Sequence, residues 1–207
     1  MKTIVFQGDS ITDARRSREE DQFRGSGYVT MTAGKIGLDF PGKYNILNRG
    51  VSGDRIVDLY ARMKADILNL NPDVLTILIG VNDTWHAYGP DNGVPVAKYE
   101  KVYDLLLCEI KEDLPECKIV ILEPFVLPGC DTEEIFDEFY ADIVLRQQVC
   151  RKLCAKHDLP FVPLQKPLEA LAEQTSNDYV LFDGVHPTSA GHAVISRELY
   201  KVLQPVL

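Results

Sequence analysis

Five residues in four separate segments of the chain are of the types that ester hydrolysis requires. Ser10 can act as the nucleophile, His186 as the base that takes its proton, and Asp183 as the group that orients the histidine ring. Gly53 and Asn82 can add hydrogen-bond donors, since a glycine N–H can approach a ligand closely and asparagine carries an amide. The N–H of Ser10 would be a third donor for the oxyanion. We therefore predict a serine hydrolase.

The elements that must position these residues follow an alternating pattern. Short apolar runs alternate with segments of helical period, which indicates parallel strands connected by helices. Strands are predicted over residues 2–7, 44–48, 73–79, 117–122 and 159–162. Helices are predicted over residues 26–38, 54–69, 96–113, 135–157 and 188–203. No repeat and no linker rich in Pro, Gly or Ser divides the chain, so we expect one domain over residues 1–207.

The candidate residues come directly after the predicted strands. G-D-S-I-T (8–12) follows the first strand, R-G-V-S-G-D (49–54) the second and G-V-N-D (80–83) the third. Ligand sites in open parallel sheets lie at the carboxyl ends of the strands, so we expect three loops at one rim. D-G-V-H-P (183–187) precedes the last helix, and Pro187 favours an extended His186.

A second pair, Asp83 and His86, has the same D-x-x-H spacing as Asp183 and His186. We favour the later pair, because His86 lies beside Trp85 and Tyr88 in a segment more typical of a wall of the site. The flat faces of such aromatic side chains pack well on sugar rings, although core aromatics look the same in a sequence. Each signal is weak alone, and only the joint occurrence favours a catalytic site.

Charge and hydropathy exclude several classes of protein. The chain of 207 residues carries 22 basic and 31 acidic side chains, a net charge of −9 that would repel nucleic acid. The first residues, M-K-T-I-V-F-Q-G-D-S, are too short an apolar run for a secretory signal, and no apolar stretch of about 18 residues follows. We expect a cytoplasmic protein without nucleic-acid or membrane partners.

The cysteines suggest neither a disulfide framework nor a metal site. They are odd in number, contain no C-x-x-C pair and are expected to be reduced thiols: Cys108, Cys117, Cys130, Cys150 and Cys154. Cys150, Cys154 and His157 can share one helical face, but a fourth ligand is not evident. We interpret them as the buried face of a helix and predict no metal and no cofactor.

The four motifs G-D-S-I-T, N-R-G-V-S-G-D, G-V-N-D and D-G-V-H-P resemble those of the SGNH (GDSL) hydrolase superfamily in order and spacing, across essentially the whole chain. The resemblance implies that Ser10 is the nucleophile and that Asp183 and His186 complete the triad. It implies an oxyanion hole of Ser10, Gly53 and Asn82. It also implies an α/β fold, a flavodoxin-like three-layer α/β/α sandwich whose five-stranded parallel sheet has the order 2-1-3-4-5.

A narrower resemblance concerns the substrate. G-D-S-I-T-D-A-R-R, G-S-G-Y-V, I-G-V-N-D-T-W-H-A-Y and D-G-V-H-P-T-S-A-G-H are similar to segments of bacterial intracellular xylan acetylesterases. This implies deacetylation of sugars or xylo-oligosaccharides and a homo-oligomer, with the charged segment 14–24 as a candidate contact. We predict that Asp9, Trp85 and Tyr88 contact the substrate. Segments 14–24 and 87–95 do not match, so the substrate's identity stays open.

Three alternatives remain. A lipid or thioester acyl hydrolase would use the same triad but would need a long apolar groove, which the loops 84–95 and 123–134 do not settle. Asp9 after an apolar strand suggests an aspartyl-phosphate phosphatase with magnesium, disfavoured because Ile11 stands where such enzymes carry a second acid. A sugar-binding protein without catalysis is disfavoured because every required group is present.

Overall fold

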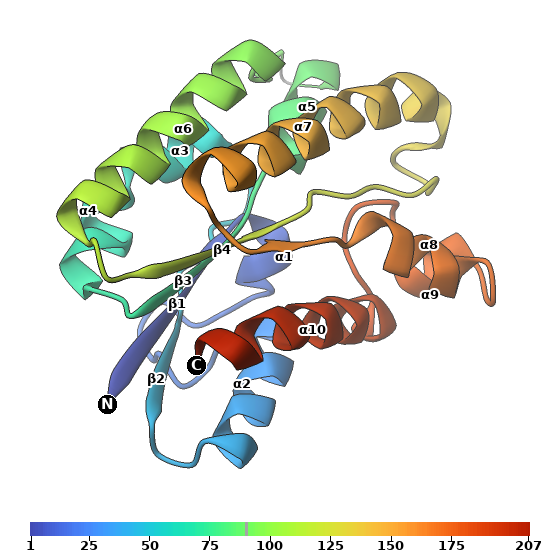
Figure 1. Ribbon diagram of the computed structural model, residues 1–207. Coiled ribbons are helices and arrows are strands. Elements are labelled where there is room, and N and C mark those ends of the chain that lie inside the picture. Colours follow the sequence, from blue (N-terminus) through green and yellow to red (C-terminus); the bar gives the residue numbers. More distant parts are fainter. Residues whose placement is uncertain (90) are drawn as a thin grey trace.

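A parallel sheet forms the centre of the molecule. The computed structural model describes residues 1–89 and 91–207, so Pro90 of the predicted 87–95 segment lies outside the described residues. The strands are β1 (Lys2–Gly8), β2 (Tyr44–Asn48), β3 (Val74–Leu78), β4 (Lys118–Leu122) and β5 (Phe161–Val162). They pair in parallel in the order β2-β1-β3-β4-β5 (Figure 1), which confirms the predicted sheet.

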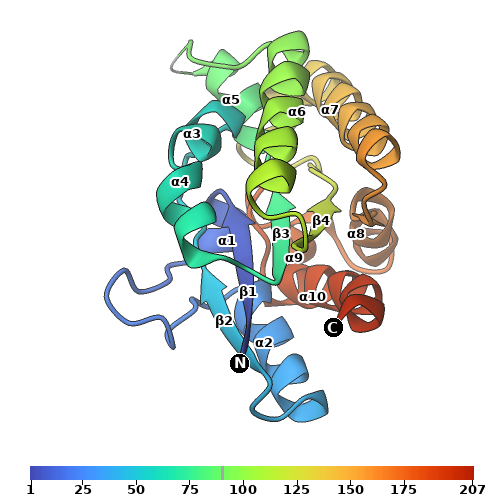
Figure 2. The ribbon, with the colours of Figure 1, turned by 60° about the vertical axis from the view of Figure 1, so that its left-hand side comes forward.

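Helices cover both faces of this sheet and complete three layers (Figure 2). On one face lie α2 (Tyr28–Asp39) and α10 (Ser189–Leu203); on the other lie α3 (Ile56–Ala61), α6 (Val96–Asp113) and α7 (Phe136–His157). The two cores alternate along β1, where Ile4 and Phe6 belong to one cluster and Val5 to the other. Both faces of the strand are buried, as expected of a parallel sheet covered on both sides.

The helix predicted over 54–69 is interrupted in the structure. It consists of α3, α4 (Met63–Asp66) and a short 3-10 turn (Leu68–Leu70). Arg62, between α3 and α4, leaves helical geometry with φ −102° and ψ 5°. Its guanidinium bonds to groups at the end of β1 and to Asp54, so the break aims this side chain toward the candidate site.

Short helices replace two of the predicted loops. Residues 10–13 form α1 (Ser10–Asp13) and residues 81–88 form α5 (Val81–Tyr88). The prediction that segments 8–12 and 80–83 are loops is therefore wrong, because most of their residues are helical. Neither segment has the apolar period of a long helix, and Asn, Asp, Ser and Thr favour turns when isolated. Two further helices were not predicted, α8 (Gln165–Ala172) and α9 (Asn177–Val180).

No helix of the described chain is both long enough and apolar enough to cross a membrane.

Candidate active site

Ser10 lies where β1 turns into α1. Gly8 makes this turn possible, because its φ of +155° is unfavourable for other residues and a Cβ there would lie 2.3 Å from the Leu78 carbonyl oxygen. Asp9 then caps α1 by accepting the Ile11 N–H at 3.0 Å. Ser10 is therefore the first residue of a helix that starts at the carboxyl end of the sheet.

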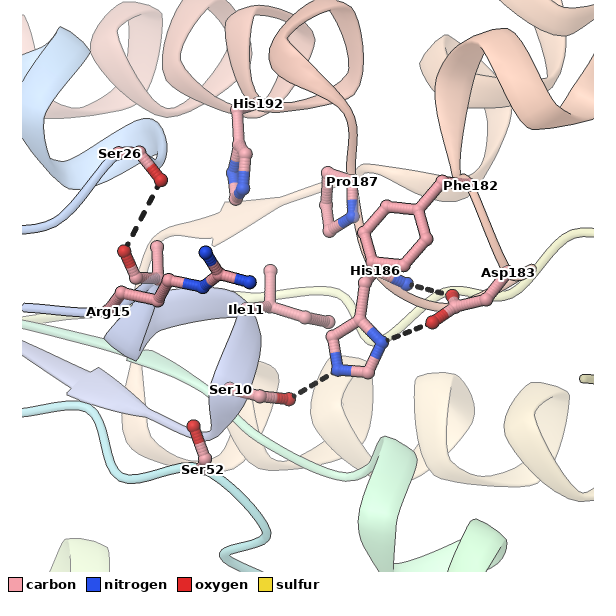
Figure 3. Close-up of a pocket in the computed structure, with 11 residues that line it drawn as sticks. Ser10, Ile11, Arg15, Ser26, Ser52, Phe182, Asp183, His186, Pro187 and His192 are labelled. Atoms are coloured by element: carbon pink, nitrogen blue, oxygen red, sulfur yellow. Dashed lines mark hydrogen bonds and ion pairs between the residues drawn. The ribbon is translucent and has the colours of Figure 1, made fainter.

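Three side chains form a hydrogen-bonded chain at this edge (Figure 3). Ser10 Oγ lies 2.8 Å from His186 Nε2, and His186 Nδ1 lies 2.6 Å from Asp183 Oδ2. The other oxygen of Asp183 accepts the backbone N–H groups of Val185 at 2.9 Å and His186 at 2.7 Å. The local turn thus fixes the carboxylate, the carboxylate fixes the imidazole, and the imidazole faces the serine.

The pair has the charge distribution that a base and its orienting acid need. Burial opposes the charge of Asp183, but the hydrogen bonds from the His186 ring and from the backbone outweigh it and hold the pKa of this carboxyl below its usual value. The hydrogen bond with Asp183 raises the pKa of His186 above its ordinary value, against burial. Asp183 therefore stays ionised while His186 can take up a proton.

Gly53 lies in a turn held from both sides. The preceding Ser52 donates its N–H to Asp13 Oδ2 at 3.1 Å, and the carbonyl of the following Asp54 accepts Asn82 Nδ2 at 3.0 Å. Gly53 has φ +86°, which favours glycine. Within residues 1–89 and 91–207, neither the Gly53 N–H nor the Ser10 N–H has an acceptor. Both donors are therefore available to a ligand, as is the second amide hydrogen of Asn82.

Asp83 connects the Asn82 segment to the Gly53 segment. Its carboxylate is fully buried, and each oxygen lies 3.1 Å from the Ile56 N–H at the start of α3. Burial raises the pKa of Asp83 to about 7, although the nearby Arg146 lowers it. Among the described residues no hydrogen bond joins Asp83 to His86, and burial lowers the pKa of His86. Asp83 positions the backbone of the two donor segments, a role that the sequence did not reveal.

Arg62 also stabilises the segments that carry Ser10 and Gly53. Its guanidinium donates to Asp54 Oδ2 at 2.5 Å, to the Gly8 carbonyl at 3.2 Å and to Asp66 Oδ2 at 2.9 Å. It thereby links the end of β1, which carries the serine, to the residue that follows Gly53. The sequence does not reveal this contact, because Arg62 lies in the middle of a segment predicted as one regular helix.

The three predicted substrate contacts occupy different environments. The centroid of the Trp85 ring lies 5.7 Å from the centroid of the His186 ring. Trp85 also packs edge-on against Phe139. Tyr88 is 43% exposed and stacks on Phe139, one turn farther along α5. Asp9 is only 1% exposed, and burial raises its pKa to about 7. Its carboxylate is used within the fold as the cap of α1, so this geometry does not favour the predicted contact between Asp9 and the substrate.

A cavity of about 470 Å³ opens beside the Ser10 hydroxyl and the His186 ring. Its walls combine apolar and polar side chains, and besides the triad they include Ile11, Arg15, Ser26, Ser52, Phe182, Pro187 and His192 (Figure 3). The exposed Phe182 ring stacks on the imidazole of His186 with a centroid distance of 5.7 Å. Apart from Phe182, these wall residues lie in the segments on which the family resemblance rests, but the sequence predicted no role for their side chains.

The side chains of metal-ligand type lie elsewhere. Cys150 and Cys154 are buried, as predicted, and Cys150 Sγ lies 3.3 Å from Tyr99 Oη. His157 instead bonds to Asp104 at 2.7 Å, and Cys108 lies near both. Lys156 already pairs with Asp104 at 2.6 Å, so a cation there would compete with an ammonium group.

Comparison with known proteins agrees with this geometry. Residues 6–194 match the model of the GDSL-like lipase/acylhydrolase family. The chain is 28% identical to an acetylxylan esterase of Geobacillus stearothermophilus over 207 residues, covering 94% of this chain and 90% of that protein.

Solved structures resemble the whole fold. A putative GDSL-like lipase from Parabacteroides merdae superposes with a TM-score of 0.93 at 36% identity, covering 98% of this chain and 95% of that one. Axe2, an acetylxylan esterase from Geobacillus stearothermophilus, superposes with a TM-score of 0.88 at 27% identity, covering 98% and 94%. The chain therefore belongs to the GDSL-like lipase/acylhydrolase family and is a carboxylic ester hydrolase.

Proposed function

We propose that this protein is a serine esterase that removes acetyl groups from acetylated sugars or xylo-oligosaccharides through an acyl-enzyme intermediate. The observation that carries the proposal is the hydrogen-bonded chain of Ser10, His186 and Asp183 beside a cavity of about 470 Å³. The acetylxylan esterase relatives support the choice of acetyl and sugar.

The residues fit a two-step acyl transfer. Ser10 Oγ bonds to the carbonyl carbon of the ester while its proton moves to His186 Nε2, which lies 2.8 Å away. The carbonyl oxygen becomes an oxyanion, with the N–H groups of Ser10 and Gly53 and the Asn82 amide as donors. The C–O bond to the alcohol then breaks, and the proton passes from His186 to the leaving oxygen.

The second step releases acetate. Water attacks the acetyl group on Ser10 and gives a proton to the neutral His186, which returns it to Ser10 Oγ as the acyl bond breaks. Asp183 stays ionised throughout and holds the imidazole by Nδ1.

The cavity lining favours a sugar as the alcohol part. Ile11, Phe182 and Pro187 offer apolar faces, while Ser26 and Ser52 offer hydroxyl groups. A pyranose ring has both apolar faces and hydroxyl edges, so this mixture suits it better than a long alkyl chain. Trp85 lies beside His186, with ring centroids 5.7 Å apart, and Tyr88 lies farther along α5. Both are proposed to contact the substrate.

The test uses an activated acetate ester and an acetylated xylo-oligosaccharide. We expect burst release of 4-nitrophenol from 4-nitrophenyl acetate, acetate release from the oligosaccharide, and fluorophosphonate labelling at Ser10. Label found on any other residue would overturn the assignment of the nucleophile. Rates that peak at acyl chains of eight carbons or more would instead favour the lipid or thioester hydrolase.

A homo-oligomer and a cytoplasmic location are also proposed. Phe23, in the charged segment 14–24, is 60% exposed, and such a side chain is suited to a contact between subunits. Light scattering of the purified protein tests this, since a monomer over a range of concentrations would contradict it. Fractionation of the source cells tests the location.

A further inference from the structure

One wall of the catalytic cavity carries hydrogen-bond donors that ester hydrolysis does not use. Arg15, Ser26 and His192 line the cavity on the side of Ser10 away from Asp183 (Figure 3). They come from the end of α1, from the segment before α2 and from α10. The Ser26 hydroxyl donates to the Ala14 carbonyl at 3.4 Å, so Arg15 and His192 supply the donors that remain for the cavity.

Arg15 has a backbone conformation that favours glycine. Its φ is +64°, and it follows Ala14 at +42°. A left-handed conformation is unfavourable for a residue with a Cβ, whereas glycine adopts it freely. Neighbouring arginines pair with acids, Arg18 with Asp13 and Arg49 with Asp21, but among the described residues no ion pair includes Arg15. Within residues 1–89 and 91–207, no ion-pair partner explains why an arginine occupies this position.

His192 presents a donor of fixed orientation. Its Nδ1 accepts the Tyr28 N–H at 3.2 Å, which places the ring proton on Nε2. Burial lowers the pKa of His192 to about 4, so the ring is neutral at pH 7. A Cβ at Gly27 would lie 2.9 Å from Cε1, so only glycine there leaves room for the ring.

The donor of His192 has no acceptor within the described chain. The side chain is 8% exposed, and its ring points into the cavity (Figure 3). No hydrogen bond engages Nε2 among residues 1–89 and 91–207. This N–H is open to the cavity and has no acceptor there, so it is suited to donate a hydrogen bond to a ligand oxygen.

These groups together match a carboxylate. A guanidinium presents a planar set of donors, and charge-assisted bonds from it are among the strongest hydrogen bonds in proteins. The neutral Nε2–H of His192 supplies a further donor, while Ile11 and Pro187 provide apolar surface for the attached ring. An acetyl group occupies little of about 470 Å³, so the rest of this cavity is available to the alcohol part of the ester.

We propose that Arg15 and His192 form a carboxylate-binding subsite, so that the preferred substrates are acetylated sugars that carry an acidic group, such as a uronic acid. This inference rests on the proposed deacetylase function. The net charge of −9 repels anions at long range, but salt screens such repulsion beyond about 8 Å. Recognition of an anionic sugar therefore requires a local cation, which Arg15 provides.

The test compares an acetylated methyl glucuronoside with its methyl ester, which differs by one charge. We expect kcat/KM for the acid to exceed that for the ester about tenfold, mainly through KM. Arg15→Gly fits the backbone and should bring this ratio to about one. His192→Asn keeps an acceptor for the Tyr28 N–H but removes the donor into the cavity, so the ratio should fall about threefold.

A surface variant serves as the control for net charge. Arg197 lies on α10, is exposed and pairs with its neighbour Glu198, so Arg197→Gln removes one positive charge away from the cavity. We expect the acid-to-ester ratio to stay unchanged in Arg197→Gln. A similar fall of the ratio in Arg197→Gln and Arg15→Gly would show that only overall charge matters and would overturn the subsite.

Inhibition separates failure of the subsite from failure of the proposed function. Methyl glucuronoside without an acetyl group should inhibit 4-nitrophenyl acetate hydrolysis competitively, about tenfold more strongly than methyl xyloside, and Arg15→Gly should remove the difference. Equal inhibition by both glycosides, or equal cleavage of acid and ester, would overturn the subsite. If the acid inhibits as expected but no acetylated sugar is cleaved, the subsite stands and the deacetylase function fails.

Discussion

Two segments of this protein share the pattern D-x-x-H but differ in the hydrogen bonds that the acid makes. Asp183 and His186 lie in a turn before α10, where the carboxylate bonds both to the backbone N–H and to the ring of His186. Asp83 and His86 lie within α5, where the carboxylate turns away to accept the Ile56 N–H. The same spacing gives an acid bonded to its histidine in one case and a backbone anchor in the other. Backbone geometry, not spacing, therefore decides whether the acid of such a pair bonds to its histidine.

Replacing His186 and His86 by alanine, one at a time, should show the difference between the two segments most clearly. His186→Ala deletes the proposed base, and we expect kcat to fall about 10⁴-fold or more, as in Ser10→Ala. His86→Ala should change kcat less than about threefold, because that ring bonds to neither Asp83 nor Ser10. Steady-state hydrolysis of 4-nitrophenyl acetate measures both variants. If His86→Ala lost most of its kcat while its fold stayed unchanged, the base would be His86 in α5 and the assignment of His186 would be wrong.

The same change in the two acids should separate their roles. Asp183→Asn removes the charge that stabilises protonated His186, so kcat should fall about 10³- to 10⁴-fold with little change in the fold. Asp83→Asn keeps a carbonyl that can accept the Ile56 N–H, so kcat should fall no more than about tenfold. Circular dichroism checks the fold of both variants. Equal losses of activity would mean that Asp83 does more than anchor the backbone.

Asn82, the neighbour of Asp83, tests what the α5 segment contributes to chemistry. Asn82→Ala removes one proposed oxyanion donor, and we expect kcat to fall about 10²- to 10³-fold with a much smaller change in KM. Asn82→Asp, which replaces the donor by a carboxylate, should be at least as damaging. A loss confined to KM would argue that Asn82 binds substrate rather than the transition state.

The pH profile should report the raised pKa of His186. The base must be neutral, so kcat/KM should fall about tenfold per pH unit once the pH drops below that pKa, which lies above the ordinary 6.5. In Asp183→Asn the hydrogen bond that raises this pKa is lost, so the inflection should move to lower pH. Turnover that stays flat between about pH 8 and 5 would exclude His186 as the base.

The raised pKa of the buried Asp83 should have a modest effect on how the stability of the protein depends on pH. Asp83 has a usual pKa of 3.8 and a folded pKa of about 7, so the folded state retains a proton that the unfolded state has lost. The stability of the natural protein should therefore decline as the pH rises from about 4 to 7, while Asp83→Asn escapes this decline. We expect the Tm of Asp83→Asn to gain a few degrees on the natural protein between these pH values. A difference in Tm that is independent of pH would contradict the raised pKa.

Much of this molecule could be predicted from the sequence. The alternation of apolar runs and helical periods located five strands within about two residues, because burial on both faces imposes a continuous apolar run on a parallel strand. Five site residues were predicted because each comes just after a strand or just before the last helix: Ser10, Gly53, Asn82, Asp183 and His186. Position relative to the sheet is a local property, so a sequence can carry it.

The tertiary structure alone decided how the side chains point and which are buried. Asp9 looked accessible beside Ser10, yet the turn after β1 directs it inward as a helix cap. The contacts of Arg62 with the end of β1, and the presence of Arg15 and His192 on one cavity wall, join residues that are far apart in the chain. Hydrophobic pattern and spacing act along the chain and could be predicted from it, whereas orientation and burial depend on packing between distant segments.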